Sequence, residues 1–196
     1  MSKKDVLNQR TNQVTIVLND SGADCFKSSR HIVQQLRCND LLCILYIACI
    51  KHDNDIDEET QHVKTPHYHL IIKLDRSYRL GTMINLICDT FHCNANQVQI
   101  DKCTSLCMQS RYLIHLDEID KYHYDENDVI TFDCHNSRSE FTDYLNRLVK
   151  LNDINDIIFL VNQFPRLDIL IQKIGLENYK KYRTVIQDLR RENLRY

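Results

Sequence analysis

The sequence predicts an α+β fold, in which a split β-α-β antiparallel sheet is followed by a small all-α region. Short β-branched or alternating segments alternate with helically spaced apolar residues over the first two thirds of the chain. From about Ser137 onward, only helical spacing remains. With 43% hydrophobic and 27% charged residues, the 196-residue chain can bury a core, so general disorder is excluded.

The first strand and helix are expected near the N-terminus. Residues 14–18 form a β-branched run that ends in turn-forming residues, which predicts a strand. Ser28 is expected to cap a helix that carries Ile32 and Leu36 on one face. Residues 41–50 are continuously apolar and predict a central strand covered on both faces. At ten residues, this run is too short to span a bilayer.

The next strand is expected after a polar, acidic loop at residues 52–65. Residues 66–74 alternate with period two, so that Tyr68 and Leu70 belong to an apolar face and His67 and His69 to the other face. The remaining predicted elements are a helix at residues 80–91, a strand at 97–100, a helix at 104–116 and a strand at 129–132.

The order of these elements, β-α-β-β-α-β, matches a ferredoxin-like split arrangement with helices on one face of an antiparallel sheet. The opposite face is then expected to be free to carry a site. The change of texture predicts one domain at residues 1–134 and a helical domain at 135–196. Apolar stripes on short helices need a partner, which is either a second copy of the chain or the first domain.

Composition excludes several functions. The three glycines stand far apart, so neither a P-loop nor a dinucleotide-binding fingerprint is present. The net charge is −2, with −4 in residues 1–132 and +2 in residues 133–196, so any contact with DNA must come from a local patch. The nine cysteines include no C-x-x-C pair, and residues 1–13 lack the apolar segment of an export signal. Reduced thiols in a cytoplasmic protein with no membrane partner are therefore expected.

Two histidines of one strand suggest a metal site. His67 and His69 lie on the same side of their strand, about 6.5–7 Å apart, which suits two ligands of one ion. His52 and Asp55, which follow the preceding apolar run, could complete a shell of three imidazoles and one carboxylate. Such donors fit Mn²⁺, Mg²⁺ or a similar divalent ion. An isolated H-x-H would by itself be ordinary surface decoration.

Tyr112 is the candidate nucleophile. It lies on the helix expected from Thr104, where a tyrosine is most often a core or boundary aromatic. Beside a metal-binding strand, covalent catalysis is the alternative: the phenol attacks a phosphodiester whose oxygens are polarised by the metal. This chemistry needs no ATP, which is consistent with the missing P-loop.

Three motifs in order resemble the small plasmid rolling-circle replication initiators, which are HUH endonucleases (U is a hydrophobic residue). They are Tyr-Ile-Ala-Cys-Ile-Lys-His-Asp-Asn-Asp at residues 46–55, Pro-His-Tyr-His-Leu at 66–70 and Tyr-Leu-Ile-His at 112–115. The resemblance runs from about residue 14 to 132. It implies the HUH endonuclease fold and a site-specific enzyme that nicks and rejoins single-stranded DNA.

By position, the resemblance implies that His52, Asp55, His67 and His69 hold Mn²⁺ or Mg²⁺ and that Tyr112 is the nucleophile. Tyr112 would take the 5′-phosphate and release a 3′-hydroxyl primer. The implied partners are single-stranded DNA, double-stranded origin DNA, a host helicase and polymerase, and further copies of the chain. This chain departs from many relatives in having His115 where they carry a lysine.

Several assignments stay open. Tyr122 and Tyr124 are rival phenols, and Asp57, Glu58 and Glu59 are nearby acids for which a solvated loop is the simpler explanation. Cations on or beside the site-bearing segments are candidate phosphate contacts. They are Lys51, Lys64, Lys73, Arg76, Arg79, Lys102 and Arg111.

Three other functions remain as alternatives. A non-catalytic nucleic-acid-binding module of the same split fold would display aromatic residues on its open face, whereas here that face carries His67, His69 and Lys73. A zinc hydrolase would not need the phenol of Tyr112. A relaxase or transposase shares the chemistry, but the short chain with its helical tail favours the initiator.

Overall fold

The computed structural model describes residues 6–20, 25–57, 59–118, 120–132, 137–146, 157–158, 160–161 and 166–193. The chain forms two compact units, residues 1–145 and residues 146–196. Among the described residues, no helix is both long and apolar enough to cross a membrane. The described cysteines form no disulfide.

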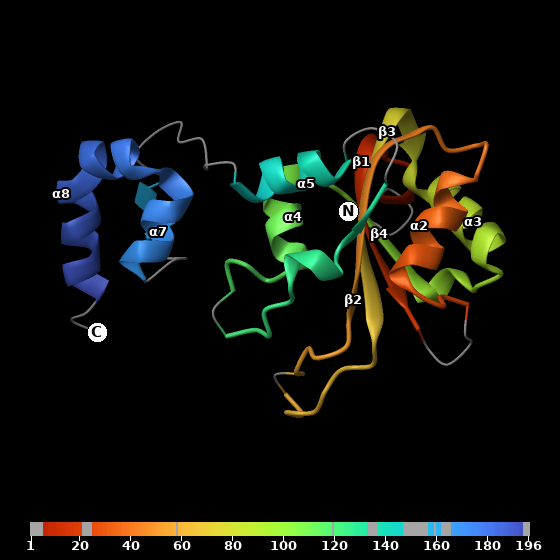
Figure 1. Ribbon diagram of the computed structural model, residues 1–196, viewed down its shortest axis with the longest axis horizontal. Helices are drawn as coiled ribbons and strands as arrows, with labels where there is room; N and C mark the ends of the chain where they lie inside the picture. The colour runs from red at the N-terminus through yellow and green to blue at the C-terminus, as the bar shows by residue number, and fades with distance from the viewer. Residues whose placement is uncertain are drawn as a thin grey trace. The chain divides into compact units, whose positions relative to one another are not determined.

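A five-stranded sheet forms the centre of the first unit (Figure 1). The strand order is β4-β1-β3-β2-β5, and every neighbouring pair is antiparallel. The predicted α+β fold with an antiparallel sheet is therefore confirmed. The strands are β1 (Arg10–Asn19), β2 (Ile44–His52), β3 (His67–Arg79), β4 (Val98–Lys102) and β5 (Ile130–Thr131).

Helices lie on both faces of this sheet (Figure 1). Helices α2 (Ser29–Arg37) and α3 (Leu80–Phe91) pack on one face, and α4 (Leu106–Leu113) and α5 (Ser137–Asn146) lie on the other. Two short 3₁₀ helices, η1 (Ala95–Gln97) and η2 (Glu126–Asp128), precede β4 and β5. The predicted cap of α2 is confirmed, because the Ser28 side chain accepts a hydrogen bond from the His31 N–H.

Alternation along β2 and β3 sends side chains into two separate cores. Leu70 and Ile72 of β3 face α2 and α3 in the larger core, as the apolar face of the strand predicts. Ile71, on the other face, packs in a second core that includes Tyr46 of β2 and Leu113 of α4. Each face of these central strands is therefore covered, and β2 is a central strand as its unbroken apolar sequence predicts.

The expectation that the second face would be free is wrong for β2 and β3. Residues of α4 and α5 bury that half, where Tyr46 and Tyr144 make an edge-to-face contact with ring centroids 5.5 Å apart. The half formed by β1 and β4 stays accessible: Thr15 is half-buried and Gln99 is exposed. Sequence spacing could not reveal this cover, because α4 and α5 come after β2 and β3 in the chain and pack back across them.

Some boundaries differ from the predicted ones. Strand β3 continues to Arg79, so α3 follows it directly. Strand β2 continues to His52, which is therefore a strand residue rather than part of the following loop. Helix α4 is shorter than predicted because it begins after the Ser105 cap and ends before His115, whose φ of 51° is incompatible with a continued helix.

The second unit is helical over its described residues. Helix α7 (Leu167–Ile174) and helix α8 (Leu176–Asn193) are joined at Gly175, whose φ of 79° suits glycine. Ile174 and Ile186 are fully buried in its small apolar core. The predicted domain boundary at 134 and the unit boundary at 145 differ by α5, which packs in the second core of the sheet. Much of the predicted helix near residues 148–156 lies outside the described residues.

Candidate metal centre

Three histidines of the predicted site meet where β2 ends and β3 begins. His52 and His67 are cross-strand partners, and His69 pairs with Ile50, which is two residues before His52 on β2. Because directly paired residues point to the same face, all three imidazoles lie on the α4 side of the sheet. The ring centroids of His52 and His69 are 4.3 Å apart, and those of His67 and His69 are 4.9 Å apart.

Asp55 brings a carboxylate to this cluster from the loop after β2. Its Oδ2 lies 3.2 Å from His52 Nδ1 and 3.6 Å from His67 Nε2. Two ligands about 2.1 Å from one ion lie about 3.0–3.4 Å apart, depending on the coordination angle. The separation of 3.2 Å falls within this range and that of 3.6 Å lies just beyond it, so small side-chain shifts bring all three atoms to the spacing of ligands of one divalent ion. His52, His67 and His69 also present ligand atoms within 4.8 Å of one another.

Main-chain carbonyls fix the protonation of two imidazoles. His52 Nε2 donates to the Leu113 carbonyl at 2.7 Å, and His67 Nδ1 donates to the Thr65 carbonyl at 3.0 Å. Since a carbonyl only accepts, the other nitrogen of a neutral ring keeps its lone pair. At His52 this lone pair faces the Asp55 carboxylate, an arrangement that requires a proton or a metal ion between them. The donor set thus fits a divalent cation.

His115 adds a fourth imidazole to the cluster. It follows α4 in the left-handed backbone region and is fully buried. Its Nδ1 donates to the Tyr122 carbonyl at 2.8 Å, whereas its Nε2 is buried and has no hydrogen-bond partner. His52, Asp55 and His115 form a second group able to hold a metal ion. An orphaned buried nitrogen is costly unless a ligand or ion satisfies it, which again fits a metal-binding role.

The electrostatics keep these groups in the forms that bind metals. Burial alone would raise the pKa of Asp55, but the hydrogen bond and charge of His52 lower it well below its ordinary value. Burial, together with repulsion from His52 and His67, lowers the pKa of His69 to about 2. Burial also lowers the pKa of His115. At neutral pH the carboxylate is ionised and both these imidazoles are neutral, as metal ligation requires.

Tyr124, one of the rival phenols, supports the carboxylate. Its hydroxyl donates to Asp55 Oδ1 and accepts from the Asn54 N–H, both at 3.0 Å. Its ring stacks on His52 with centroids 4.3 Å apart and an interplanar angle of 8°. Burial and the neighbouring Asp55 raise its pKa. Tyr124 is thus a buried, hydrogen-bonded phenol that holds Asp55 and His52 in place.

Tyr112 lies beside the cluster on the last turn of α4. It is half-buried, and its ring centroid is 5.6 Å from that of His69 and 5.3 Å from that of His115. The other rival phenol, Tyr122, is 52% exposed, and its ring packs on Tyr124. Of the three candidate phenols, Tyr112 alone combines partial exposure with a direct ring contact to an H-x-H histidine.

Lys121 is a residue of this site that the sequence did not reveal. Its Nζ lies 4.9 Å from the centroid of the Tyr112 ring and forms an ion pair with Glu118. Burial would lower the pKa of Lys121, but the hydrogen bond with Glu118 and the contact with Tyr112 raise it, so the side chain stays cationic. Lys121 is nine residues beyond Tyr112 and outside its helix, so no periodic spacing connects the two.

The candidate DNA contacts are spread along the sheet. Lys51, beside His52, pairs with Asp53, and Lys64 precedes β3 by three residues. Arg76 lies nine residues beyond His67 on β3, which is about 30 Å along the strand. Arg76 therefore cannot contact the same phosphate as the cluster does. The remaining candidates on the sheet are Lys73 and Arg79 on β3 and Lys102 on β4, all exposed or half-buried.

Arg111, another candidate DNA contact, is instead engaged in contacts within the protein. Its side chain is only 12% exposed and forms an ion pair with Asp117 at 2.9 Å. It also donates to the carbonyl of Leu145. These bonds tie the loop after α4 and the end of α5 to helix α4, so the guanidinium is directed inward rather than toward a ligand.

Asp57 of the acidic loop is engaged in hydrogen bonds within its own turn. Asp57 Oδ1 accepts hydrogen bonds from the backbone of Thr60 and Glu59 and from the Thr60 hydroxyl. These bonds, those of Thr60 first, lower the pKa of Asp57. The carboxylate therefore closes its own turn, as the simpler explanation of this loop expects. Glu58 lies outside the described residues.

The sheet and its histidine cluster define an α+β domain with a candidate metal centre, and comparison with protein families places it among DNA-replication proteins. Residues 7–136 match the family described as "Plasmid replication protein, origin binding domain". The matched segment is well over half of the chain, and the chain belongs to this family. The match supports a plasmid replication initiator that binds origin DNA. A search of curated proteins finds no match.

Proposed function

We propose that the protein initiates rolling-circle plasmid replication as a metal-dependent HUH endonuclease. It nicks one strand at the origin and rejoins it through a 5′-phosphotyrosine intermediate. The observation that carries this proposal is the position of Tyr112 against His69, at the edge of a cluster that also contains His52 and Asp55. The family match indicates plasmid origin DNA as the substrate, and the cluster provides the groups that would carry out the reaction.

The fold supports this assignment. The first four strands have the order β4-β1-β3-β2, with α2 connecting β1 to β2 and α3 connecting β3 to β4. This is the order expected of a ferredoxin-like split β-α-β arrangement. The H-x-H histidines lie on β3, the central strand of the sheet, where both faces are packed and the ligands are held rigidly.

His52, Asp55, His67 and His69 would hold the ion, with His115 facing the same space. A bound Mn²⁺ or Mg²⁺ supplies positive charge beside a non-bridging oxygen of the scissile phosphate. The Leu113 and Thr65 carbonyls keep the lone pairs of His52 and His67 directed toward Asp55. Tyr124 holds the other oxygen of that carboxylate. These residues preorganise the site before DNA arrives.

Tyr112 performs the covalent step. Its Oη forms a bond to phosphorus while the bond to the 3′-oxygen breaks, so the 5′-phosphate stays on the protein. The phenol loses its proton, and the 3′-oxygen leaves as a hydroxyl that a host polymerase can extend. The Lys121 ammonium, 4.9 Å from the Tyr112 ring centroid, stabilises negative charge that develops on the phenol. Attack by a 3′-hydroxyl on the phosphotyrosine reverses the reaction and rejoins the strand.

The accessible half of the sheet gives the single strand a path to this site. Gln13, Thr15 and Val17 of β1 are half-buried on the same face as His69, and Gln99 of β4 is exposed beside them. A host helicase and polymerase act on the opened origin. The helical second unit is assigned to self-association of the chain.

The test uses the full chain, a random single-stranded DNA library and Mn²⁺, with a denaturing gel to detect a protein–DNA adduct. The wild-type protein is expected to form an adduct that disappears with a chelator and in Tyr112→Phe. Tyr122→Phe is the matched control, because its phenol is exposed and outside the cluster, and it is expected to react normally. Sequencing the attached 5′ ends identifies the nick site.

Other outcomes point to other functions. An adduct that persists in Tyr112→Phe would identify Tyr122 or Tyr124 as the nucleophile instead. Metal-dependent cleavage without any adduct would favour a hydrolase built on the H-x-H motif. Tight, metal-independent binding without cleavage would favour a non-catalytic nucleic-acid-binding module. A preference for conjugation or transposon ends over a replication origin would favour a relaxase or transposase.

A further inference from the structure

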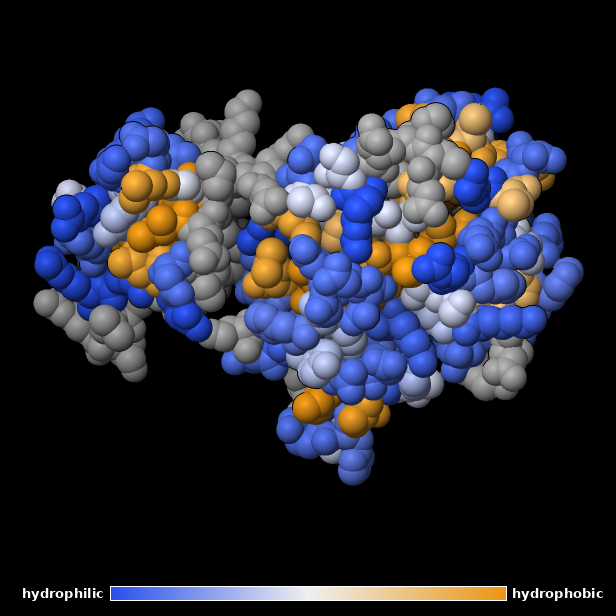
Figure 2. All heavy atoms as spheres, viewed as in Figure 1, coloured by the Kyte–Doolittle hydropathy of each residue, from blue (hydrophilic) through white to orange (hydrophobic). Residues whose placement is uncertain are grey.

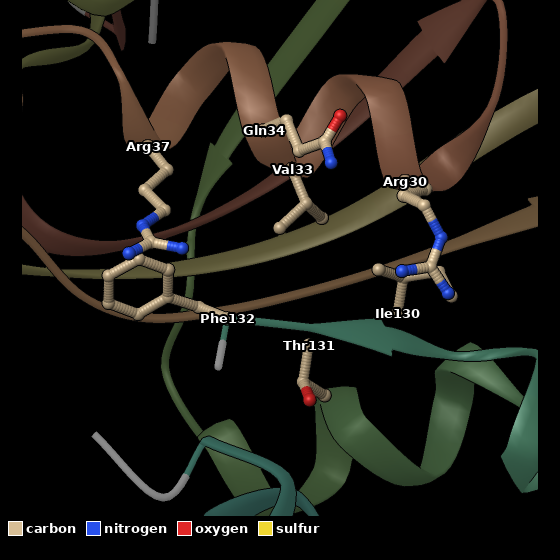
Figure 3. Close-up of a pocket in the computed structure, with 7 residues that line it drawn as sticks. All are labelled: Arg30, Val33, Gln34, Arg37, Ile130, Thr131 and Phe132. Atoms are coloured by element: carbon tan, nitrogen blue, oxygen red, sulfur yellow. The ribbon is translucent and has the colours of Figure 1, made fainter. Parts of the chain in front are cut away.

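A groove lies between helix α2 and the edge strand β5, away from the metal cluster. Its volume is about 60 Å³, and it is lined by α2, β5 and Phe132. Figure 3 shows Arg30 and Arg37 extending from α2 toward the strand, with Gln34 between them. The groove is too small for a nucleotide base, but its rim presents two guanidinium groups.

The charge of this surface contrasts with that of the surrounding unit. Residues 1–132 carry a net charge of −4, yet residues 25–38 contain no acidic side chain. None of the seven residues that line the groove is acidic. Figure 2 shows mostly hydrophilic residues, with hydrophobic ones beside them, where Figure 1 places α2. The groove is therefore a local positive patch of the kind that contact with nucleic acid requires in an acidic domain.

The spacing of the polar residues on α2 makes a regular stripe. Arg30, Gln34 and Arg37 stand at i, i+4 and i+7, so they share one helix face, and all three are exposed. The two arginines are about 10.5 Å apart along the helix axis. Two cations at this spacing on one helix face can contact phosphates of the same DNA backbone.

One of the two guanidinium groups is held in position. The Arg37 Cζ lies 4.9 Å from the centroid of the Phe132 ring. This contact restricts the side chain before any ligand binds, which reduces the entropy lost on binding. Ile32 and Leu36 of α2 are buried in the larger core against the sheet and fix the orientation of the helix.

We infer that the α2–β5 groove is a docking site for the phosphate backbone of duplex DNA, contacted by Arg30 and Arg37. The single strand is cleaved on the α4 side of the sheet, whereas the duplex is held by the α2 side. Origin binding and strand cleavage therefore use different surfaces of the same unit. This assignment does not depend on the nucleophile, because the groove shares no residue with the metal cluster.

The experiment measures how salt weakens binding of a fluorescein-labelled 20-base-pair duplex of mixed sequence. Fluorescence anisotropy of the full chain is followed at several KCl concentrations with a chelator present, so that cleavage is prevented. Each phosphate contact adds about 0.9 to the slope of log K against log salt. The double variant Arg30→Gln/Arg37→Gln is therefore expected to reduce the slope by about 1.8. Arg30→Lys/Arg37→Lys keeps both charges and is expected to keep the slope.

The matched control is Arg10→Gln/Arg166→Gln, which removes the same charge from two exposed arginines that neither line the groove nor belong to the candidate phosphate contacts. Its slope is expected to equal that of the wild type. The inference is overturned if the groove variant keeps the wild-type slope, if the control pair lowers it equally, or if only single-strand binding changes. The groove variant is also expected to form the single-strand adduct normally, whereas Tyr112→Phe keeps duplex binding, so failure of either proposal is recognised separately.

Discussion

Removal of a single hydroxyl tests how the metal centre is held. Tyr124→Phe keeps the ring that stacks on His52 but deletes the oxygen bonded to Asp55 Oδ1 and to the Asn54 N–H. Asn54 is exposed, so water replaces the bond to its N–H at little cost. Asp55 is 13% exposed, and the bond to its charged carboxylate is worth about 1.5–3 kcal/mol.

This loss is expected to appear as weaker metal binding. Removing a partner that orients a ligand typically weakens metal affinity by about 10–100-fold. That range corresponds to about 1.4–2.7 kcal/mol, which agrees with the value of the lost hydrogen bond. Calorimetric titration of Mn²⁺ into Tyr124→Phe should therefore give a dissociation constant raised by this factor. At saturating Mn²⁺, the variant should still form the covalent DNA adduct.

Tyr122→Phe is the control, because Tyr122 is exposed and its hydroxyl is not among the groups that act on Asp55 in the described residues. It should bind Mn²⁺ as the wild type does. A Tyr124→Phe variant with unchanged affinity would refute the role assigned to the hydroxyl. Loss of the adduct at saturating Mn²⁺ would instead show that Tyr124 takes part in the covalent step.

Three further predictions concern the scaffold. Arg111→Met should lower the free energy of unfolding in urea by about 2 kcal/mol, because it removes charged hydrogen bonds to Asp117, and it should leave the salt slope of DNA binding unchanged. Ser28→Ala should cost about 1 kcal/mol in the same assay by removing the α2 cap. The pKa of His69 is lower in the folded state, so its stabilising contribution is present above pH 6.5 and is lost as the pH falls toward 2. Without metal, stability should fall by up to about 2 kcal/mol between pH 7.5 and 5, and less in His69→Gln.

Periodic patterns predicted the elements that local chemistry specifies. The alternation of residues 66–74 identified the side of β3 that carries His67 and His69, and the spacing of residues 80–91 predicted α3 with the observed boundaries. These patterns depend on the local spacing of apolar residues, which can be read directly from the sequence. They could not predict that α4 and α5 would cover the same face as the histidines, since that depends on tertiary packing.

Only those residues of the candidate site that belong to the three sequence motifs could be predicted. His52, Asp55, His67 and His69 are brought together as ligand candidates, and Tyr112 lies beside them. Lys121 and the support that Tyr124 gives to Asp55 were missed, because they come from an irregular loop with no periodic signal.

The orientation of the imidazoles has a consequence for mutagenesis. Three of the histidines, His52, His67 and His115, are each fixed by a main-chain oxygen, from residues 113, 65 and 122. An alanine scan leaves every one of these oxygens in place, so positions 65, 113 and 122 would score as unrelated to metal binding. Their side chains therefore serve other purposes, and that of Leu113 fills the second core. Only a change to the backbone itself, such as replacing an amide with an ester, would expose this part of the site.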